Sequence, residues 1–154
     1  MDYPAAPLYP TFIPVMPGHP DKNDFAKVMT KDKGYVLASL RSFQKGDIMA
    51  VFSGIYTSQV TLHTLEYREN AHVHDPWFLG LLAHCCFPNV SLHFDDHTMW
   101  AEQDIPAGSF LTMDYASTES RLYRDFTVTD CLPGCRGLIT GYEGRALNPG
   151  ADDD

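Results

Sequence analysis

The sequence is short of cysteine, of basic residues and of long apolar runs. Its four cysteines are too few for a disulfide scaffold in a chain of 154 residues. No stretch approaches the roughly 18 consecutive apolar residues of a transmembrane helix, and the N-terminus lacks the basic flank and apolar run of a secretory signal. We therefore expect no membrane partner and a cytoplasmic location, or a nuclear one if the organism is eukaryotic.

The charge of the chain is unbalanced. It has 11 lysines and arginines against 20 aspartates and glutamates, a formal net charge of −9. Binding to nucleic-acid phosphates is driven by lysine and arginine, so we expect no nucleic-acid partner. Residues 46–154 carry five basic against sixteen acidic side chains. An acidic body would favour a cationic partner such as a lysine-rich segment, although acidic surfaces usually just keep proteins soluble.

The apolar content supports one folded domain of the mainly β class. Hydrophobic residues make up 44% of the chain and aromatic residues 12%, enough to bury a core at this length. Six prolines within residues 1–20 predict an extended arm over residues 1–24, whose apolar side chains indicate that it lies along the body. Apolar patterns predict strands at 35–38, 48–52, 54–56, 90–94, 98–101 and 110–115. A capped stretch predicts one short helix at 117–126.

Three separated motifs follow one another in the order and spacing of a known family. The first is Lys33-Gly34-Tyr35-Val36-Leu37-Ala38, with Phe43-Gln44-Lys45-Gly46-Asp47-Ile48 and Val51-Phe52-Ser53-Gly54 behind it. The second is His84-Cys85-Cys86-Phe87-Pro88-Asn89. The third is Ile105-Pro106-Ala107-Gly108, then Leu111-Thr112-Met113-Asp114-Tyr115, and finally Cys135-Arg136-Gly137-Leu138-Ile139-Thr140-Gly141. Over residues 25–142 the chain resembles a SET domain, the fold of most protein-lysine methyltransferases, and most of all the small stand-alone SET proteins with a post-SET tail.

The resemblance implies a fold of several small β-sheets with little helix and a pseudoknot-like crossing. In it, the C-terminal segment carries Tyr115 under the loop at 83–89, and Asn89 stabilises the crossing. The resemblance also divides the chain into a SET domain at 25–126 and an altered post-SET segment at 127–145. An acidic, disordered tail at 146–154 follows.

The same resemblance implies S-adenosylmethionine (SAM) as the cofactor and a lysine side chain of a protein as the substrate. The implied cofactor-binding residues are Lys33, Gly34, Tyr35, Ala83, His84, Cys85 and Phe126. The implied lining of the lysine channel is Phe52, Tyr56, Phe110 and Met113. Tyr115, at the end of this channel, would orient the amine for in-line methyl transfer in a site that excludes water.

Several positions depart from the family pattern. Ala83 replaces an asparagine and cannot hydrogen-bond a cofactor, and Cys85 replaces a serine. Asp32 stands where the first glycine of the glycine-rich turn belongs, and an aspartate there would repel a bound carboxylate. Met113 and Phe52 replace tyrosines. These changes fall on cofactor and channel positions.

The zinc site of the post-SET tail is also altered. Val128 and Asp130 occupy two of the four thiolate positions, which leaves Cys86 and Cys135 in place. Structural zinc requires four nitrogen or sulfur ligands, so we expect no metal and a remnant in which Cys86 and Cys135 are neighbours. Elsewhere, His72 and His74 could put two imidazoles on one face of a strand, but we expect a solvated loop there.

Two classes of function remain open. The first is a SAM-dependent methyltransferase that acts on a protein lysine. The second is a degenerate SET domain that has lost methyl transfer and either catalyses another reaction in the former cleft, such as cyclisation of a small biosynthetic metabolite, or acts as a non-catalytic binding module. The partner would then be a small-molecule substrate or a binding partner, and a homodimer is left open in both cases.

Overall fold

The computed structural model describes residues 3–31, 34–59, 64–68, 71–85, 87–114, 126–127 and 138–139. Across these residues the chain is built from short strands, with one 3-10 turn, η1 (Leu79–Leu81). The strands are β1 (Phe25–Met29), β2 (Tyr35–Ser39), β3 (Ile48–Val51), β4 (Ile55–Thr57), β5 (Thr64–Arg68), β6 (Ala71–His74), β7 (Ala83–His84), β8 (Val90–His93), β9 (Thr98–Ala101), β10 (Thr112–Met113), β11 (Phe126–Thr127) and β12 (Leu138–Ile139).

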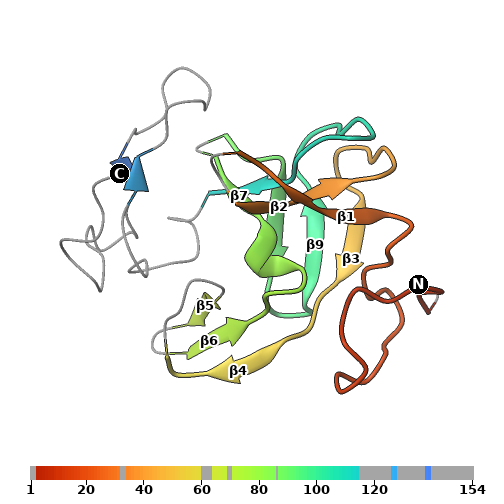
Figure 1. Ribbon diagram of the computed structural model, residues 1–154, viewed down its shortest axis with the longest axis vertical. Helices are drawn as coiled ribbons and strands as arrows, with labels where there is room; N and C mark the ends of the chain where they lie inside the picture. The colour runs from red at the N-terminus through yellow and green to blue at the C-terminus, as the bar shows by residue number, and fades with distance from the viewer. Residues whose placement is uncertain are drawn as a thin grey trace.

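The strands pair into several small sheets, as expected for the mainly β class. β1 and β2 form an antiparallel pair, β3, β9 and β8 form one three-stranded sheet, and β4, β6 and β5 form another. Figure 1 shows the sheet of β4, β6 and β5 below the one that contains β3 and β9. β7 and β10 pair in parallel, and β11 pairs with β12. The expected mainly β fold of small sheets is confirmed.

The strands expected near 35–38, 48–52, 54–56, 90–94 and 98–101 are confirmed, but β1, β5 and β6 were not predicted. The solvated loop expected around His72 is wrong, because β6 is the central strand of its sheet. Its His72 is buried opposite the equally buried Glu66 of β5. Burial lowers the pKa of His72, partly offset by the charge of Glu66. Polar side chains hid this strand from a pattern based on apolar residues. The helix expected at 117–126 lies outside the described residues, except that Phe126 begins β11.

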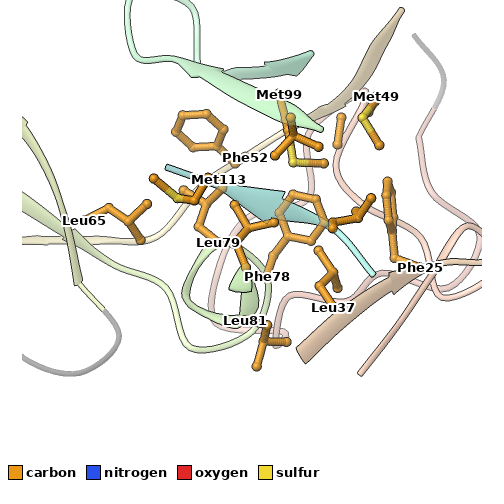
Figure 2. Packing of buried hydrophobic residues seen from close by; sticks show 14 of the residues in the cluster. Phe25, Leu37, Met49, Phe52, Leu65, Phe78, Leu79, Leu81, Met99 and Met113 are labelled. Carbon is orange, nitrogen blue, oxygen red and sulfur yellow. The ribbon is translucent and has the colours of Figure 1, made fainter. Parts of the chain in front are cut away.

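The core lies where these sheets meet. Leu37 of β2, Met99 of β9 and Leu111 are completely buried, and Phe78 and Phe52 join them in one cluster. Figure 2 shows these aromatic and aliphatic side chains from sheets distant in sequence packed together. Phe52, a predicted channel residue, therefore packs in one core with residues from the larger sheets of the described chain.

The proline-rich N-terminal segment packs against this body, as the sequence predicted. Its side chain Tyr9 is buried, and the backbone N–H of Val51 in β3 donates to the carbonyl of Gly18 at 2.7 Å. His19 is also buried, and its Nε2 lies 3.0 Å from the hydroxyl of Ser53. The segment thereby holds the backbone on both sides of Phe52.

Gly54 is required where β4 begins. A Cβ at this position would lie 2.6 Å from Cγ1 of Val73 and 2.9 Å from the backbone oxygen of His74. Only a residue without a side chain allows β4 to approach β6 this closely. The close packing of β4 against β6 thus explains Gly54 of the first motif.

Candidate functional site

The candidate site is built around the segment 110–113, which lies between β2 and β7. On one side, Phe110 forms an antiparallel bridge with Ala38, and the N–H of Leu111 donates to the carbonyl of Leu37 at 2.8 Å. Because the two segments are antiparallel, β2 begins beside the end of β10. Gly34 and Tyr35 are therefore placed toward the residues that follow Met113.

On the other side, β7 runs parallel to β10. The N–H of Ala83 donates to the carbonyl of Leu111 at 3.2 Å, and the N–H of Cys85 donates to the carbonyl of Met113 at 3.0 Å. The end of β7 and the beginning of β2 consequently lie at the same end of β10. Two predicted groups of cofactor-binding residues thus flank the strand that leads to Asp114 and Tyr115.

Asn89 fixes the crossing of the segments. Its Oδ1 accepts a hydrogen bond from the N–H of Thr112 at 2.8 Å, and its Nδ2 donates to the carbonyl of Phe110 at 2.9 Å. The N–H of Asn89 also donates to the hydroxyl of Thr112 at 3.1 Å. An amide side chain that donates and accepts at once can replace a strand neighbour here. The predicted role of Asn89 in the crossing is confirmed.

The glycine-rich turn offers open backbone. Gly34 has a φ of 70°, and no atom of the described residues lies within 4 Å of the position that a Cβ would occupy. Tyr35 follows it with half of its side chain exposed, and the ammonium of Lys27 lies 4.2 Å from the centre of its ring. A ligand can therefore approach this turn closely and meet an aromatic face.

Across β10, His84 and Asp114 contribute polar groups. His84 is buried, and its Nδ1 lies 3.9 Å from Oδ1 of the partly exposed Asp114. The thiol of Cys85 accepts a hydrogen bond from the N–H of Phe87 at 3.4 Å. The buried imidazole and the backbone bonds of β7 indicate a structural part for these side chains, with their main chain forming one wall of the site.

Of the predicted channel residues, Phe52 and Met113 are both buried in the core cluster, as Figure 2 shows. Tyr56 lies at the exposed edge of this region, on β4. Phe110 is 46% exposed, and its carbonyl accepts a hydrogen bond from Asn89. Phe52 and Met113 thus belong to one buried cluster. Tyr56 is linked to Phe52 through a residue that contacts both, whereas Phe110 lies outside this cluster.

That shared neighbour is His97, which the sequence did not single out. It lies in the turn between β8 and β9, stacks on Phe52 with ring centres 5.2 Å apart, and has its Nε2 2.6 Å from the hydroxyl oxygen of Tyr56. No sequence pattern marks it, because it stands in an acidic turn 41 residues from Tyr56.

A buried polar cluster lies on the other side of Phe52. The hydroxyl of Tyr9 donates to Oδ2 of Asp75 at 2.6 Å and accepts from the N–H of Ser53 at 2.8 Å. Oδ1 of Asp75 accepts from the N–H groups of Trp77 and Phe78. Burial raises the pKa of Asp75 to about 6, against the lowering effect of these hydrogen bonds. Burial, with the charge of Asp75, raises the pKa of Tyr9 well above its ordinary value.

A groove of about 620 Å³ lies along β8. Its lining is Phe87, Pro88, Val90, Ser91, Leu92, His93, Glu102, Gln103, Met113 and Asp114. It reaches the end of β10 but does not include the glycine-rich turn or β7.

Four further predictions fall on residues outside the described ranges. These four are the catalytic role of Tyr115, the cofactor contacts of Lys33 and Asp32, the zinc remnant of Cys86, Cys131 and Cys135, and the cofactor contact of the Phe126 side chain. All four stay predictions. Among the described side chains, no three histidines, cysteines or carboxylates gather as a metal site would require. In the same part of the chain, no helix has the length and apolar character to cross a membrane.

Comparison with solved structures identifies the fold. The methyltransferase domain of the human histone-lysine N-methyltransferase SETMAR is similar with a TM-score of 0.63 and 16% sequence identity, over 91% of this chain and 61% of that one. KRYPTONITE in complex with mCHG DNA and SAH has a TM-score of 0.61 and 17% identity, over 74% of this chain and 28% of that one. KRYPTONITE with mCHH DNA, an H3(1-15) peptide and SAH has a TM-score of 0.59 and 18% identity, over 75% and 29%.

SETMAR is a histone-lysine N-methyltransferase, and the described chain shares the SET fold of these structures. The chain spans less than two thirds of the length of each of these structures. No protein-family model and no curated protein matches the sequence. At these low identities the likeness defines the fold and leaves the activity to the site itself.

Proposed function

We propose that the protein is a SAM-dependent methyltransferase that acts on a lysine side chain of a protein. The observation that carries the proposal is the convergence, within a SET fold, of the glycine-rich turn at Gly34 and the main chain at His84 on the end of β10. Two segments far apart in sequence are thereby brought to the residue that precedes Tyr115.

The described residues at this end suit such a cofactor. No described residue crowds the Cβ position of Gly34, Tyr35 offers a half-exposed ring for the adenine, and Asp114 offers a carboxylate for a cationic group. Ala83 adds no hydrogen bond beyond its backbone, so the main chain of β7 would have to hold this side of the cofactor. When bound, SAM supplies an electrophilic methyl group on its sulfonium.

The remaining residues would prepare the amine. Phe52 and Met113 are apolar and buried, and they keep water away from the end of the channel. Tyr115 would orient the amine nitrogen toward the methyl group, so that transfer proceeds from a positioned pair rather than by random encounter. One KRYPTONITE structure contains an H3 peptide, which supports a peptide substrate for a protein with this fold.

The net charge of −9 supports a cationic peptide over a nucleic acid, even though the KRYPTONITE structures contain DNA. That this chain binds no nucleic acid stays a prediction. A gel-shift titration of the chain with duplex DNA at low salt tests it, and a shift at micromolar protein would contradict it.

The direct test of the proposed function is transfer of a labelled methyl group from SAM to lysine peptides on an array, followed by mass spectrometry of the products. We expect an increase of one or more methyl groups on lysine, lost in Tyr115→Phe and retained in Tyr3→Phe. Tyr3 is the matched control because it is exposed on the N-terminal segment. Lack of both SAM binding and transfer would overturn the proposal in favour of a SET fold with another activity.

A further inference from the structure

His97 has an unusual backbone for a residue with a side chain. Its φ is 57°, and among the described residues it is the non-glycine with a positive φ. Histidine adopts this region more readily than most residues, but such conformations gather at functional sites because the surrounding structure must hold them. The carbonyl of His97 is held by the N–H of Phe52 at 2.8 Å, which anchors the turn to the end of β3.

The imidazole of His97 joins two predicted channel residues. Its ring lies nearly parallel to that of Phe52, with an interplanar angle of 22° and ring centres 5.2 Å apart. Its Nε2 lies 2.6 Å from Oη of Tyr56, a short hydrogen bond. The backbone contact, the stacking and the hydrogen bond together fix the position of the phenol hydroxyl relative to the core.

Tyr56 is half-exposed, unlike the ring of Phe52. Half of the Tyr56 side chain is exposed, whereas Phe52 is 1% exposed. Tyr56 is paired with Val73 of β6, and Val73 belongs to the core cluster, so the phenol is on the core side of its sheet. An incoming side chain can therefore meet a hydroxyl whose orientation an imidazole sets.

We propose that Tyr56 and His97 act as a pair that binds the substrate ammonium and takes up its proton. This inference rests on the proposed function, because methyl transfer requires a neutral amine. Tyr56 would contact the amine, and His97 would be a positioning residue that acts through Tyr56.

The proton step is balanced within the pair. In the tautomer with its proton on Nδ1, His97 accepts the Tyr56 O–H at Nε2. A proton of the ammonium passes to Oη of Tyr56 as the phenol proton passes to Nε2. The products are a neutral amine, an intact phenol and an imidazolium, with no change in oxidation state.

Several titratable groups of the described residues lie on the elements around the pair. Asp95 and Asp96 lie on the same turn as His97, and Asp96 accepts a hydrogen bond from the hydroxyl of Thr98. Tyr9 approaches Tyr56 from the N-terminal segment and interacts with it electrostatically. On β6 the residues on either side of Val73, His72 and His74, project to the opposite face of the sheet.

The test uses His97→Gly, Tyr56→Phe and the double variant in the full chain. Glycine keeps the positive φ and removes only the imidazole, and phenylalanine removes only the hydroxyl. Positioned acid-base groups contribute on the order of 100-fold or more to rates, so we expect each single variant to lower kcat at neutral pH by about 10- to 100-fold. The loss should shrink as pH rises, because more of the amine is already neutral, and the double variant should be no slower than the slower single one.

Asp95→Asn, on the same turn, is the matched control and should keep kcat within about twofold. Wild-type kcat in both single variants across the pH range would overturn the inference. So would a double variant whose loss is the product of the two single losses, because the residues would then act independently.

A binding measurement without SAM separates this inference from the proposed function. A lysine peptide is titrated against the wild type and the variants, together with the same peptide carrying norleucine, which lacks the ammonium. We expect the wild type to bind the lysine peptide more tightly, and both single variants to lose that preference. If the wild type transfers no methyl group, the proposed function fails, but this titration still shows whether Tyr56 and His97 bind an ammonium group. Equal affinity of the wild type for the two peptides would overturn the inference about Tyr56 and His97.

Discussion

Two tyrosine hydroxyls lie near Phe52 with the same short contact but in opposite environments. Oη of Tyr9 is 2.6 Å from Oδ2 of Asp75, and Oη of Tyr56 is 2.6 Å from Nε2 of His97. Tyr9 is 5% exposed and Asp75 is completely buried, whereas Tyr56 is 50% exposed. Both pairs connect a phenol to an ionisable partner, so the difference between them is burial.

Burial decides what each pair can do. The lone pairs and protons of the Tyr9–Asp75 pair are used by Ser53, Trp77 and Phe78, and a buried group without its partner is costly. That pair stabilises the docking of the N-terminal segment. The Tyr56–His97 pair has an exposed hydroxyl that can exchange one partner for another, which suits a group that receives a substrate.

Phe52 contacts both regions, so its truncation should disturb both of them and have the largest effect on stability. It stacks on His97, packs against Phe94 with ring centres 5.3 Å apart, and precedes Ser53 of the buried cluster. We expect Phe52→Ala to lower the free energy of unfolding by about 3–5 kcal/mol. Urea denaturation followed by tryptophan fluorescence measures it.

Phe110→Ala is the control for size and residue type. Phe110 is largely exposed, so its truncation should cost less than about 1 kcal/mol. A similar loss in both variants would show that Phe52 is not the structural link between the two regions.

The buried carboxyl of Asp75 should make the stability of the protein depend on pH. Its folded-state pKa of about 6 lies above its ordinary value of 3.8, so the folded protein binds more protons than the unfolded chain between these values. The stability that Asp75 contributes is therefore present at low pH and is lost as pH rises through about 6. Relative to Asp75→Asn, the wild type should gain about 2–3 kcal/mol between pH 7 and pH 4.

Paired urea melts of the two proteins at several pH values measure this difference. Referring the wild type to Asp75→Asn removes the contribution of every other titrating group. A difference that stays constant, or that grows in the opposite direction, would mean that Asp75 is not the desolvated carboxyl described above.

The two tyrosine-to-phenylalanine variants compare the regions directly. Tyr9→Phe leaves Oδ2 of Asp75 and the N–H of Ser53 without their partner, and should cost about 1–3 kcal/mol. Tyr56→Phe removes a hydroxyl that water can replace, and should change stability by less than about 0.5 kcal/mol. Thermal unfolding of both variants checks the ranking, and equal losses would remove the distinction between a structural and a reactive hydroxyl.

His97→Gly should also have only a small effect on stability. The variant loses the stack on Phe52 but relieves a positive φ that glycine adopts freely. We expect a net change within about 1 kcal/mol. A loss of several kcal/mol in urea denaturation would assign His97 to the structural region instead.

The sequence was most informative where function depends on local motifs. The order of the motifs around Gly34, His84 and Asp114 predicted the SET fold, and the amide of Asn89 predicted the crossing. Short apolar runs located β2, β3, β8 and β9, whose residues are mostly buried or half-buried.

Contacts between distant side chains could not be predicted in the same way. Tyr9 and Asp75 are 66 residues apart and Tyr56 and His97 are 41 apart, and neither pair belongs to a local pattern. β6 was also missed, because its buried His72 gives the segment a polar composition. Buried polar side chains depend on tertiary partners, which composition alone does not supply.

Calorimetric titration with SAM of the wild type, Gly34→Ala and Gly46→Ala tests the central claim most directly. Both glycines have a positive φ, and no described residue crowds either Cβ position, so alanine introduces backbone strain of the same kind at both. Only Gly34 lies at the end of β10 where the cofactor is proposed to bind. The account predicts micromolar binding by the wild type and Gly46→Ala, and clearly weaker binding by Gly34→Ala. Absence of binding by the wild type, or equal binding by all three proteins, would contradict it.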